Sequence, residues 1–273
     1  NLTHGTGSEV NRFAVATVTK LNYKPAIAYD CIYPRFAIDD PALMTGLSPD
    51  QTRFVSIDAV NHVVEAATTT VTNPFAISLA AETIRLVHQW LPVALADPGD
   101  LKARYQLCYA AMQAGVAFDN GLLHFTHALE HPLSAVSPDL SHGLGLAVLL
   151  PAVILECYPA RPDVLAHILA PLAPGLKGLS EEAPQAAKAV EQWLASVGVP
   201  QKLEDLGVTA ADVDKFCDLV EQTPSLGLLI SVAPVEGTRE RVARIYNNSL
   251  KHLAYDRSPL PPHGALQLEE VSA

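Results

Sequence analysis

The stretch HFTHALEHPLSAVSPDLSHGLGLAVLLP (residues 124–151) is the most informative part of the chain for its fold. Apolar residues at helical spacing predict one helix over about residues 120–133 and a second over about residues 142–157. Between them lies a segment of Ser, Pro and Asp, residues 134–141, of the kind that forms loops. The stretch therefore predicts two consecutive helices of a mainly helical fold.

Histidines gather in these two predicted helices. His127 and His131 stand four residues apart and so share one helix face. We assign His124 a structural role. His142, directly before a glycine, could equally be an ordinary helix cap. Three histidines within eight residues of an otherwise apolar helix nevertheless favour a functional cluster over scattered surface residues.

A carboxylate and another histidine occupy an earlier predicted helix. Ser48 followed by Pro49 is typical of a helix start, and the helix is expected to run to about residue 69. Within it, Asp58 and His62 lie one turn apart on the same face, where a simple hydrogen bond between them is the ordinary explanation. Taken with the later histidines, however, one carboxylate and several imidazoles without a thiolate form a ligand set for Fe²⁺ or Zn²⁺.

The pattern of the chain divides it into three parts. Residues 1–40 read as a loop and short strands, which we interpret as a small β remnant. Residues 41–257 are expected to form a helical domain, and residues 258–273, rich in proline, a flexible tail. Strands are predicted at 13–18, 26–29 and 36–38, and further helices at about 74–94, 98–117, 162–170, 180–197, 209–222 and 237–251.

Composition narrows the function classes. The chain has 273 residues, 49% of them hydrophobic and 17% charged, with a formal net charge of -11. An acidic chain argues against nucleic acid and anionic membranes as partners, and the apolar run of residues 144–157 is shorter than a bilayer span. Four scattered cysteines without a C-x-x-C pair are typical of reduced thiols in a cytoplasmic protein.

Four groups of residues occur in an order that is typical of one enzyme family. They are Thr3-x-Gly5-Thr6-Gly7-Ser8-Glu9-Val10, Lys24-x-Ala26-Ile27, Asp58-Ala59-x-x-His62-x-x-Glu65-Ala66, and Ala117-Phe118-Asp119-Asn120 with His127-Ala128-Leu129-Glu130-His131-Pro132-Leu133 and Ser141-His142-Gly143.

In these motifs the chain resembles the iron-containing (group III) alcohol dehydrogenases, whose helical C-terminal metal-binding domain has a dehydroquinate synthase-like architecture. The resemblance implies an alcohol oxidised to an aldehyde or ketone, or the reverse, with NAD or NADP as hydride carrier, Fe²⁺ or another divalent metal, and a homodimer. The implied roles are metal ligands Asp58, His62, His127 and His142; a catalytic histidine near the cofactor, His131; and dinucleotide contacts Thr3, Gly5, Thr6, Ser8 and Lys24.

The chain departs from the family pattern in two places. The spacing from His127 to His142 is one residue longer, with the extra residue in the loop around residues 136–139. The family's Gly-rich phosphate loop does not occur in the sequence, so we expect the chain to lack most of the N-terminal nucleotide-binding domain. The resemblance then implies that residues 1–40 are the remnant of this dinucleotide-binding α/β domain. A non-catalytic metal-binding helical fragment is therefore an alternative. A metallopeptidase using H-x-x-E-H at residues 127–131 is another, although this motif leaves Asp58 and His62 unexplained.

Overall fold

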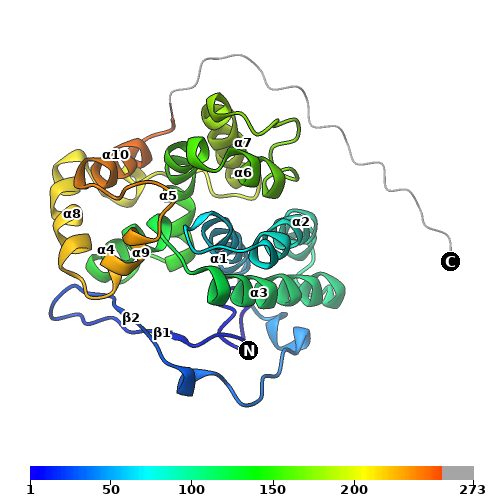
Figure 1. The fold of residues 1–273 in the computed structure, drawn as a ribbon. Helices are drawn as coiled ribbons and strands as arrows, with labels where there is room; N and C mark the ends of the chain where they lie inside the picture. The colour runs from blue at the N-terminus through cyan, green and yellow to red at the C-terminus, as the bar shows by residue number, and fades with distance from the viewer. Residues whose placement is uncertain (254–273) are drawn as a thin grey trace.

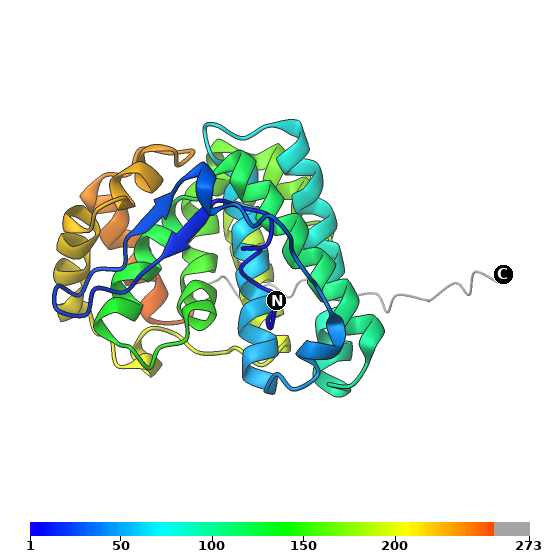
Figure 2. The ribbon, with the colours of Figure 1, turned by 90° about the horizontal axis from the view of Figure 1, so that it is seen from below.

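The computed structural model describes residues 1–253, and the predicted tail at 258–273 lies outside them. The mainly helical fold is confirmed (Figure 1). The helices form a bundle along which the N-terminal segment runs as a thin layer, and Figure 2 shows this segment crossing the bundle. The division into residues 1–40 and 41–257 stays a prediction.

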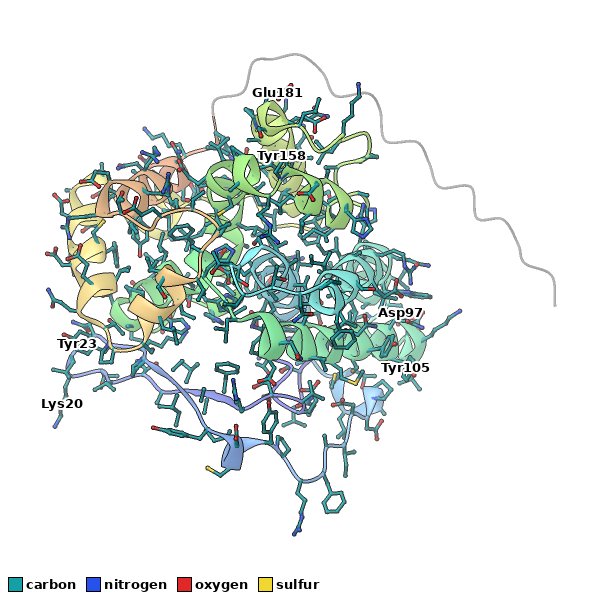
Figure 3. All side chains as sticks on the ribbon, in the orientation of Figure 1. Lys20, Tyr23, Asp97, Tyr105, Tyr158 and Glu181 are labelled. Carbon is teal, nitrogen blue, oxygen red and sulfur yellow. The ribbon has the colours of Figure 1, made fainter. Side chains whose placement is uncertain are left out.

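Two short strands form the only sheet in the described residues. β1 (Phe13–Val15) pairs antiparallel with β2 (Ala26–Ala28), with Ala14 opposite Ile27. The hairpin between them carries Lys20 and Tyr23 at its outer tip (Figure 3). The strand predicted at 36–38 is wrong: this stretch pairs with no strand among residues 1–253, and its apolar side chains are exposed. Short 3-10 turns complete the segment at Asp30–Ile32 and Pro41–Met44.

Three long helices pack side by side to form one half of the bundle: α1 (Pro49–Thr68), α2 (Pro74–Ala96) and α3 (Leu101–Gly121). Each begins at a side-chain cap. For α1, the hydroxyl of Ser48 accepts a hydrogen bond from the backbone N–H of Gln51 at 3.1 Å. This N–H group has no acceptor within the helix itself, so the cap satisfies it. Most residues of α1 are buried, so its polar side chains face other elements rather than water.

The predicted pair of helices is confirmed as α4 (Phe125–Val136) and α5 (His142–Cys157). The start of the first is later than predicted because α3 continues to Gly121. Leu122 then takes a left-handed φ of 61°, which turns the chain between the two helices. Gly143 lets the first turn of α5 approach α1, because a Cβ there would lie 2.2 Å from the carbonyl oxygen of Phe54.

The apolar stretch around α5 is longer than the run of residues 144–157 that was expected to be too short to span a bilayer. Residues His142–Ala160 are long and apolar enough to cross a membrane by length and composition alone, because the helix continues beyond residue 157 into the 3-10 turn Tyr158–Ala160. In the structure, 72% of that window is buried inside the protein. The hydrophobicity of α5 is explained by its position, since it contributes side chains to both hydrophobic cores.

Shorter helices complete the described fold: α6 (Pro162–Ile168), α7 (Ala183–Ser196), α8 (Val213–Gln222), α9 (Leu226–Ser231) and α10 (Arg239–Leu250). Of these, α7 and α10 pack against α5. Four of them were predicted, and the starts of α7 and α8 are later because 3-10 turns at Ser180–Glu182 and Ala210–Asp212 precede them. A further 3-10 turn lies at Glu204–Leu206. The sequence did not predict α9, which lies beside the hairpin: the backbone N–H of Ala26 donates to the Ser225 hydroxyl at 3.0 Å.

Candidate metal centre

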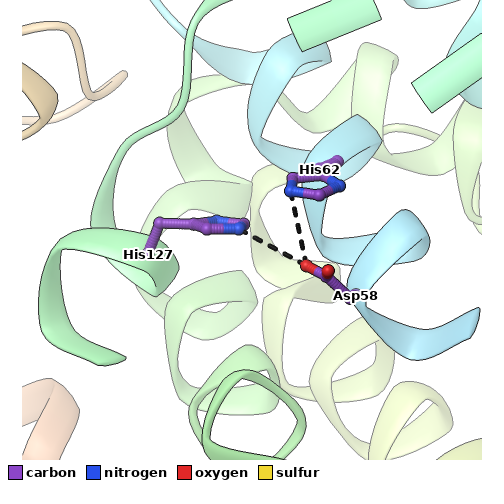
Figure 4. Close-up of side chains that lie close together, drawn as sticks. All are labelled: Asp58, His62 and His127. Atoms are coloured by element: carbon purple, nitrogen blue, oxygen red, sulfur yellow. Dashed lines mark ion pairs between the residues drawn. The ribbon is translucent and has the colours of Figure 1, made fainter. Parts of the chain in front are cut away.

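Three of the four predicted ligands meet between α1 and α4 (Figure 4). The Oδ1 atom of Asp58 lies 3.3 Å from Nε2 of His62 and 3.6 Å from Nε2 of His127. The two imidazole rings stack with centroids 4.7 Å apart. Helical spacing brings the first two together, and the packing of α4 against α1 brings the third.

Glu65 fixes the position of α4 and the ring of His127. It lies two turns after Asp58 on α1 and is fully buried. Its Oε1 accepts hydrogen bonds from the backbone N–H groups of Thr126 at 2.5 Å and His127 at 3.4 Å, and its Oε2 contacts Nδ1 of His127. No side chain at the start of α4 caps the helix. Glu65 caps it instead from α1, by accepting hydrogen bonds from its first backbone N–H groups. Sequence reasoning missed this role, although the spacing of residues 58, 62 and 65 along one face could have indicated it.

The charge balance of this α1–α4 cluster (Asp58, His62, Glu65 and His127) favours a cation. Burial alone would raise the pKa of Asp58, but the neighbouring imidazoles hold that pKa well below its ordinary value. Burial alone would lower the pKa of His127, but Glu65 and Asp58 raise it to about 9. Two buried carboxylates thus draw positive charge toward this point, and burial of such charge without compensation is costly.

The donor atoms also fit a divalent cation. Oδ1 of Asp58 and Nε2 of His127 are buried and have no hydrogen-bond partner in the part of the chain that the structure describes. Two ligand atoms that each stand about 2.0–2.2 Å from one ion are about 3.0–3.6 Å apart. The observed separations of 3.3 and 3.6 Å are in that range, so the cluster is spaced as a metal site requires.

The fourth predicted ligand lies beside this cluster in a second group. We call Lys24, Glu130, His131 and His142 the α4–α5 cluster, after the two helices that carry the acid and the histidines. Nδ1 of His142 contacts Oε2 of Glu130, and the His142 ring centroid stands 5.5 Å from that of His127. His142 thus lies next to His127 but outside the group formed by Asp58, His62 and His127, and a different carboxylate holds it.

Lys24 supplies a cation to the α4–α5 cluster. Its Nζ lies 3.3 Å from Oε2 of Glu130, 2.8 Å from the hydroxyl of Ser134 and 3.2 Å from Nδ1 of His142. His131 is buried, its Nδ1 has no hydrogen-bond partner among residues 1–253, and burial lowers its pKa to about 3. Lys24, predicted from the resemblance to contact a dinucleotide, therefore lies directly against His142, one of the predicted metal ligands.

A cavity of about 780 Å³ opens onto both clusters. All four predicted ligands and His131 line it, together with Thr6, Ser8 and Lys24; Thr3 and Gly5 do not. Apolar side chains from the hairpin, from the end of α3 and the turn after it, and from α9 form most of the wall, among them Phe13, Val15, Ile27, Phe118, Leu122, Leu123, Leu228 and Leu229.

The loop that lines one side of this cavity is fastened by a buried histidine that sequence reasoning did not single out. His4 is 1% exposed. Nη1 of Arg104, a fully buried residue of α3, donates to Nε2 of His4 at 3.1 Å, and the hydroxyl of Ser56 lies 3.3 Å from Nδ1. These contacts bind the first residues of the chain to α1 and α3.

The arrangement of residues 127–131 does not suit the H-x-x-E-H alternative. His127 and His131 belong to different clusters, and their ring centroids are 6.4 Å apart with the rings nearly perpendicular. Glu130, which would have to activate water, is fully buried and engaged by His142 and Lys24.

The fold and the site together define a mainly helical protein with a candidate metal centre between two of its helices. Sequence comparison gives the family to which it belongs. Residues 54–250 match the profile described as Fe-containing alcohol dehydrogenase family, C-terminal. The chain belongs to the Fe-containing alcohol dehydrogenase family.

Individual relatives agree with this membership. The chain is 58% identical to the long-chain primary alcohol dehydrogenase AdhA of Thermoanaerobacter ethanolicus, over 91% of this chain and 62% of that protein. It is 36% identical to 1,3-propanediol dehydrogenase of Citrobacter freundii, over 91% and 64% respectively. The crystal structure of NADH-dependent butanol dehydrogenase A from Thermotoga maritima matches with a TM-score of 0.81 at 27% identity, over 92% and 65% of the two chains. The chain thus spans less than two thirds of the length of these relatives.

Proposed function

We propose that this protein is a metal-dependent oxidoreductase that interconverts an alcohol and its aldehyde or ketone with NAD or NADP as hydride carrier. The convergence of Asp58, His62 and His127 on one point carries the proposal. When bound there, a divalent metal such as Fe²⁺ supplies Lewis-acid polarisation of a substrate oxygen.

The residues around the proposed metal site have different roles. Asp58, His62 and His127 would hold the ion, with His142 as a fourth ligand from α5. Glu65 keeps the His127 ring in place. His131, whose pKa burial lowers to about 3, is neutral at physiological pH, and its Nδ1 has no hydrogen-bond partner within the described part of the chain. We assign it to the path along which the alcohol proton leaves.

The cavity supports an alcohol with an apolar chain as the substrate class. Its wall is mainly apolar and includes Leu122 and Leu228, and the Phe118 ring lies 4.6 Å from the His62 ring, centroid to centroid. Apolar groups in such a cavity gain about 0.8 kcal/mol for each buried CH₂. The relatives named for long-chain primary alcohols and for butanol point in the same direction.

The remaining assignments follow from the resemblance and the cavity lining. Thr6, Ser8 and Lys24 line the cavity and would contact the dinucleotide, while Thr3 and Gly5 would act in the loop beside it. The name of the butanol dehydrogenase favours NAD over NADP. We further propose a cytoplasmic homodimer that acts on small molecules, without nucleic acid or membrane as partner.

A loading and activity experiment tests the proposal. The purified protein is loaded with Fe²⁺ or Zn²⁺ under nitrogen and assayed for NAD⁺ and NADP⁺ reduction with straight-chain primary alcohols from ethanol to octanol. We expect metal-dependent turnover that rises with chain length. We also expect loss of metal and activity in His127→Gln but not in His167→Gln, an exposed histidine on α6. Failure of the wild type to bind either metal would overturn the proposal, and metal binding without NAD(P)H binding would indicate the non-catalytic alternative.

A further inference from the structure

Two buried glutamates stand in the same relation to two histidines. Glu65 contacts Nδ1 of His127, and Glu130 contacts Nδ1 of His142. Both carboxylates are 0% exposed. Each acid comes from a helix other than the one that carries its histidine, Glu65 from α1 and Glu130 from α4. The same contact therefore occurs twice, once in each cluster.

This contact determines which ring nitrogen can bind a cation. A carboxylate accepts a hydrogen bond from Nδ1–H, which leaves the lone pair on Nε2. The two nitrogens point away from one another, so a ring held by Nδ1 presents Nε2 on its other side. For His127 that atom is the one observed 3.6 Å from Asp58.

Lys24 does not replace Glu130 as the partner of His142. Its Nζ also lies 3.2 Å from Nδ1 of His142, but the Glu130 oxygen is closer to that atom. The ammonium has two other acceptors, the hydroxyl of Ser134 at 2.8 Å and the Glu130 carboxylate at 3.3 Å. Lys24 thus balances the charge of Glu130, while Glu130 orients the ring.

The chain makes room for Glu130 through a glycine on α5. A Cβ at position 145 would lie 2.8 Å from Cγ of Glu130 and 3.0 Å from its Oε1. Any larger residue at that position would push the carboxylate away from His142. Glu130 receives no backbone hydrogen bond within residues 1–253, unlike Glu65, and so its role is not that of a helix cap.

We propose that Glu65 and Glu130 are paired positioning residues that hold His127 and His142 by Nδ1 and direct both Nε2 atoms to the same cation. This inference rests on the proposed metal site and adds two acids that act through the ligands. Outer carboxylates of this kind raise the basicity of the ring, and their loss typically weakens metal binding by about 10–100-fold.

Glu130→Gln tests the proposal, with Glu191→Gln as its matched control. Glu191 is also a buried acid that contacts a lysine, Lys202, and a histidine, His252, but on another face of the protein. Co²⁺ affinity is measured by competition with a chelator, together with the Co²⁺ absorption spectrum and urea unfolding in excess chelator. We expect Glu130→Gln to weaken Co²⁺ binding by about 10–100-fold and to alter the spectrum, with the control unchanged in both.

Gly145→Ala provides a second variant that keeps the carboxylate but displaces it. We expect it to weaken Co²⁺ binding in the same way as Glu130→Gln. Wild-type affinity in both variants would overturn the inference while leaving the metal site intact. A second Co²⁺ that binds the wild type and is lost in Glu130→Gln would also overturn it, because Glu130 would then be a ligand itself. Absence of Co²⁺ binding in the wild type would instead contradict the proposed function.

Discussion

The α1–α4 and α4–α5 clusters contain the same kinds of residue but differ in where their positive charge comes from. In the α4–α5 cluster, Lys24 places its ammonium 3.3 Å from Glu130. In the α1–α4 cluster, neither Asp58 nor Glu65 has a lysine or arginine within ion-pair distance among the described residues. A buried acid normally meets a cation from the chain. The cluster without one is therefore where an external cation fits best.

Glu65→Ala should have the largest effect on the α1–α4 cluster. It would leave the first N–H groups of α4 and Nδ1 of His127 without a partner. Loss of one member of such a buried network costs about 3–5 kcal/mol. Urea unfolding in excess chelator measures the change, with Glu82→Ala, which breaks an exposed pair with Arg85, as a control expected to cost less than about 1 kcal/mol. Equal losses in both variants would contradict the capping role.

Asp58→Asn tests whether the Asp58 carboxylate is needed to bind the cation. The change keeps the shape of the side chain and removes its charge. We expect the rise in melting temperature on addition of Zn²⁺ to disappear, because a 100-fold loss of affinity removes about 2.7 kcal/mol of ligand-linked stability. Scanning calorimetry with Zn²⁺ and with chelator measures this effect. An unchanged rise would place the cation elsewhere.

The two clusters also differ in how much of them the sequence predicted. Asp58 and His62 share one helix, so a spacing of four residues was sufficient to bring them together, and the structure does so. The packing of α4 against α1 brings in His127 as predicted. By contrast, nothing in helical periodicity indicates that Lys24, on a short segment far away in the chain, reaches Glu130 and His142. That contact depends on where the hairpin lies across the bundle.

The fold shows the same division between local and long-range information. Helices with strong caps and apolar spacing, such as α1 and α2, begin as predicted. The missed helix α9 has six residues and begins after Ser225 with a left-handed φ of 76°, so it has neither length nor an ordinary cap to reveal it. The wrong strand at 36–38 is apolar and extended in pattern, but it has no partner strand among residues 1–253, and strand identity depends on pairing.

A third buried contact, between Arg104 and His4, differs from both clusters because it contains no carboxylate. Here a buried guanidinium faces a neutral imidazole. Burial, assisted by Arg104, lowers the pKa of His4 from 6.5 to about 4. Because the unfolded chain takes up that proton first, the contribution of His4 to stability is complete above about pH 6.5 and is lost as the pH falls toward 4. We expect a loss of about 2–3 kcal/mol over this range.

The pH dependence of urea unfolding measures this effect, with His4→Gln for comparison. The variant has no titrating group at that position, so its stability should fall less steeply between pH 6.5 and 4 than that of the wild type. Parallel pH profiles for the two proteins would show that the proton binds elsewhere.

A double-mutant cycle on Lys24 and Glu130 measures the coupling energy between them, which is the smallest of the expected effects. It tests directly whether Lys24 supplies the positive charge of the α4–α5 cluster. Lys24→Met leaves the Glu130 carboxylate buried without its ammonium, whereas Lys24→Met combined with Glu130→Gln removes both charges. Because the two groups are in contact, we expect a coupling energy of about 1–2 kcal/mol in urea unfolding with chelator present. The double variant should be more stable than the sum of the single losses predicts, since no uncompensated charge remains. A coupling energy near zero would mean that Lys24 is not the cation that balances Glu130, and the two clusters would then no longer differ in the source of their positive charge.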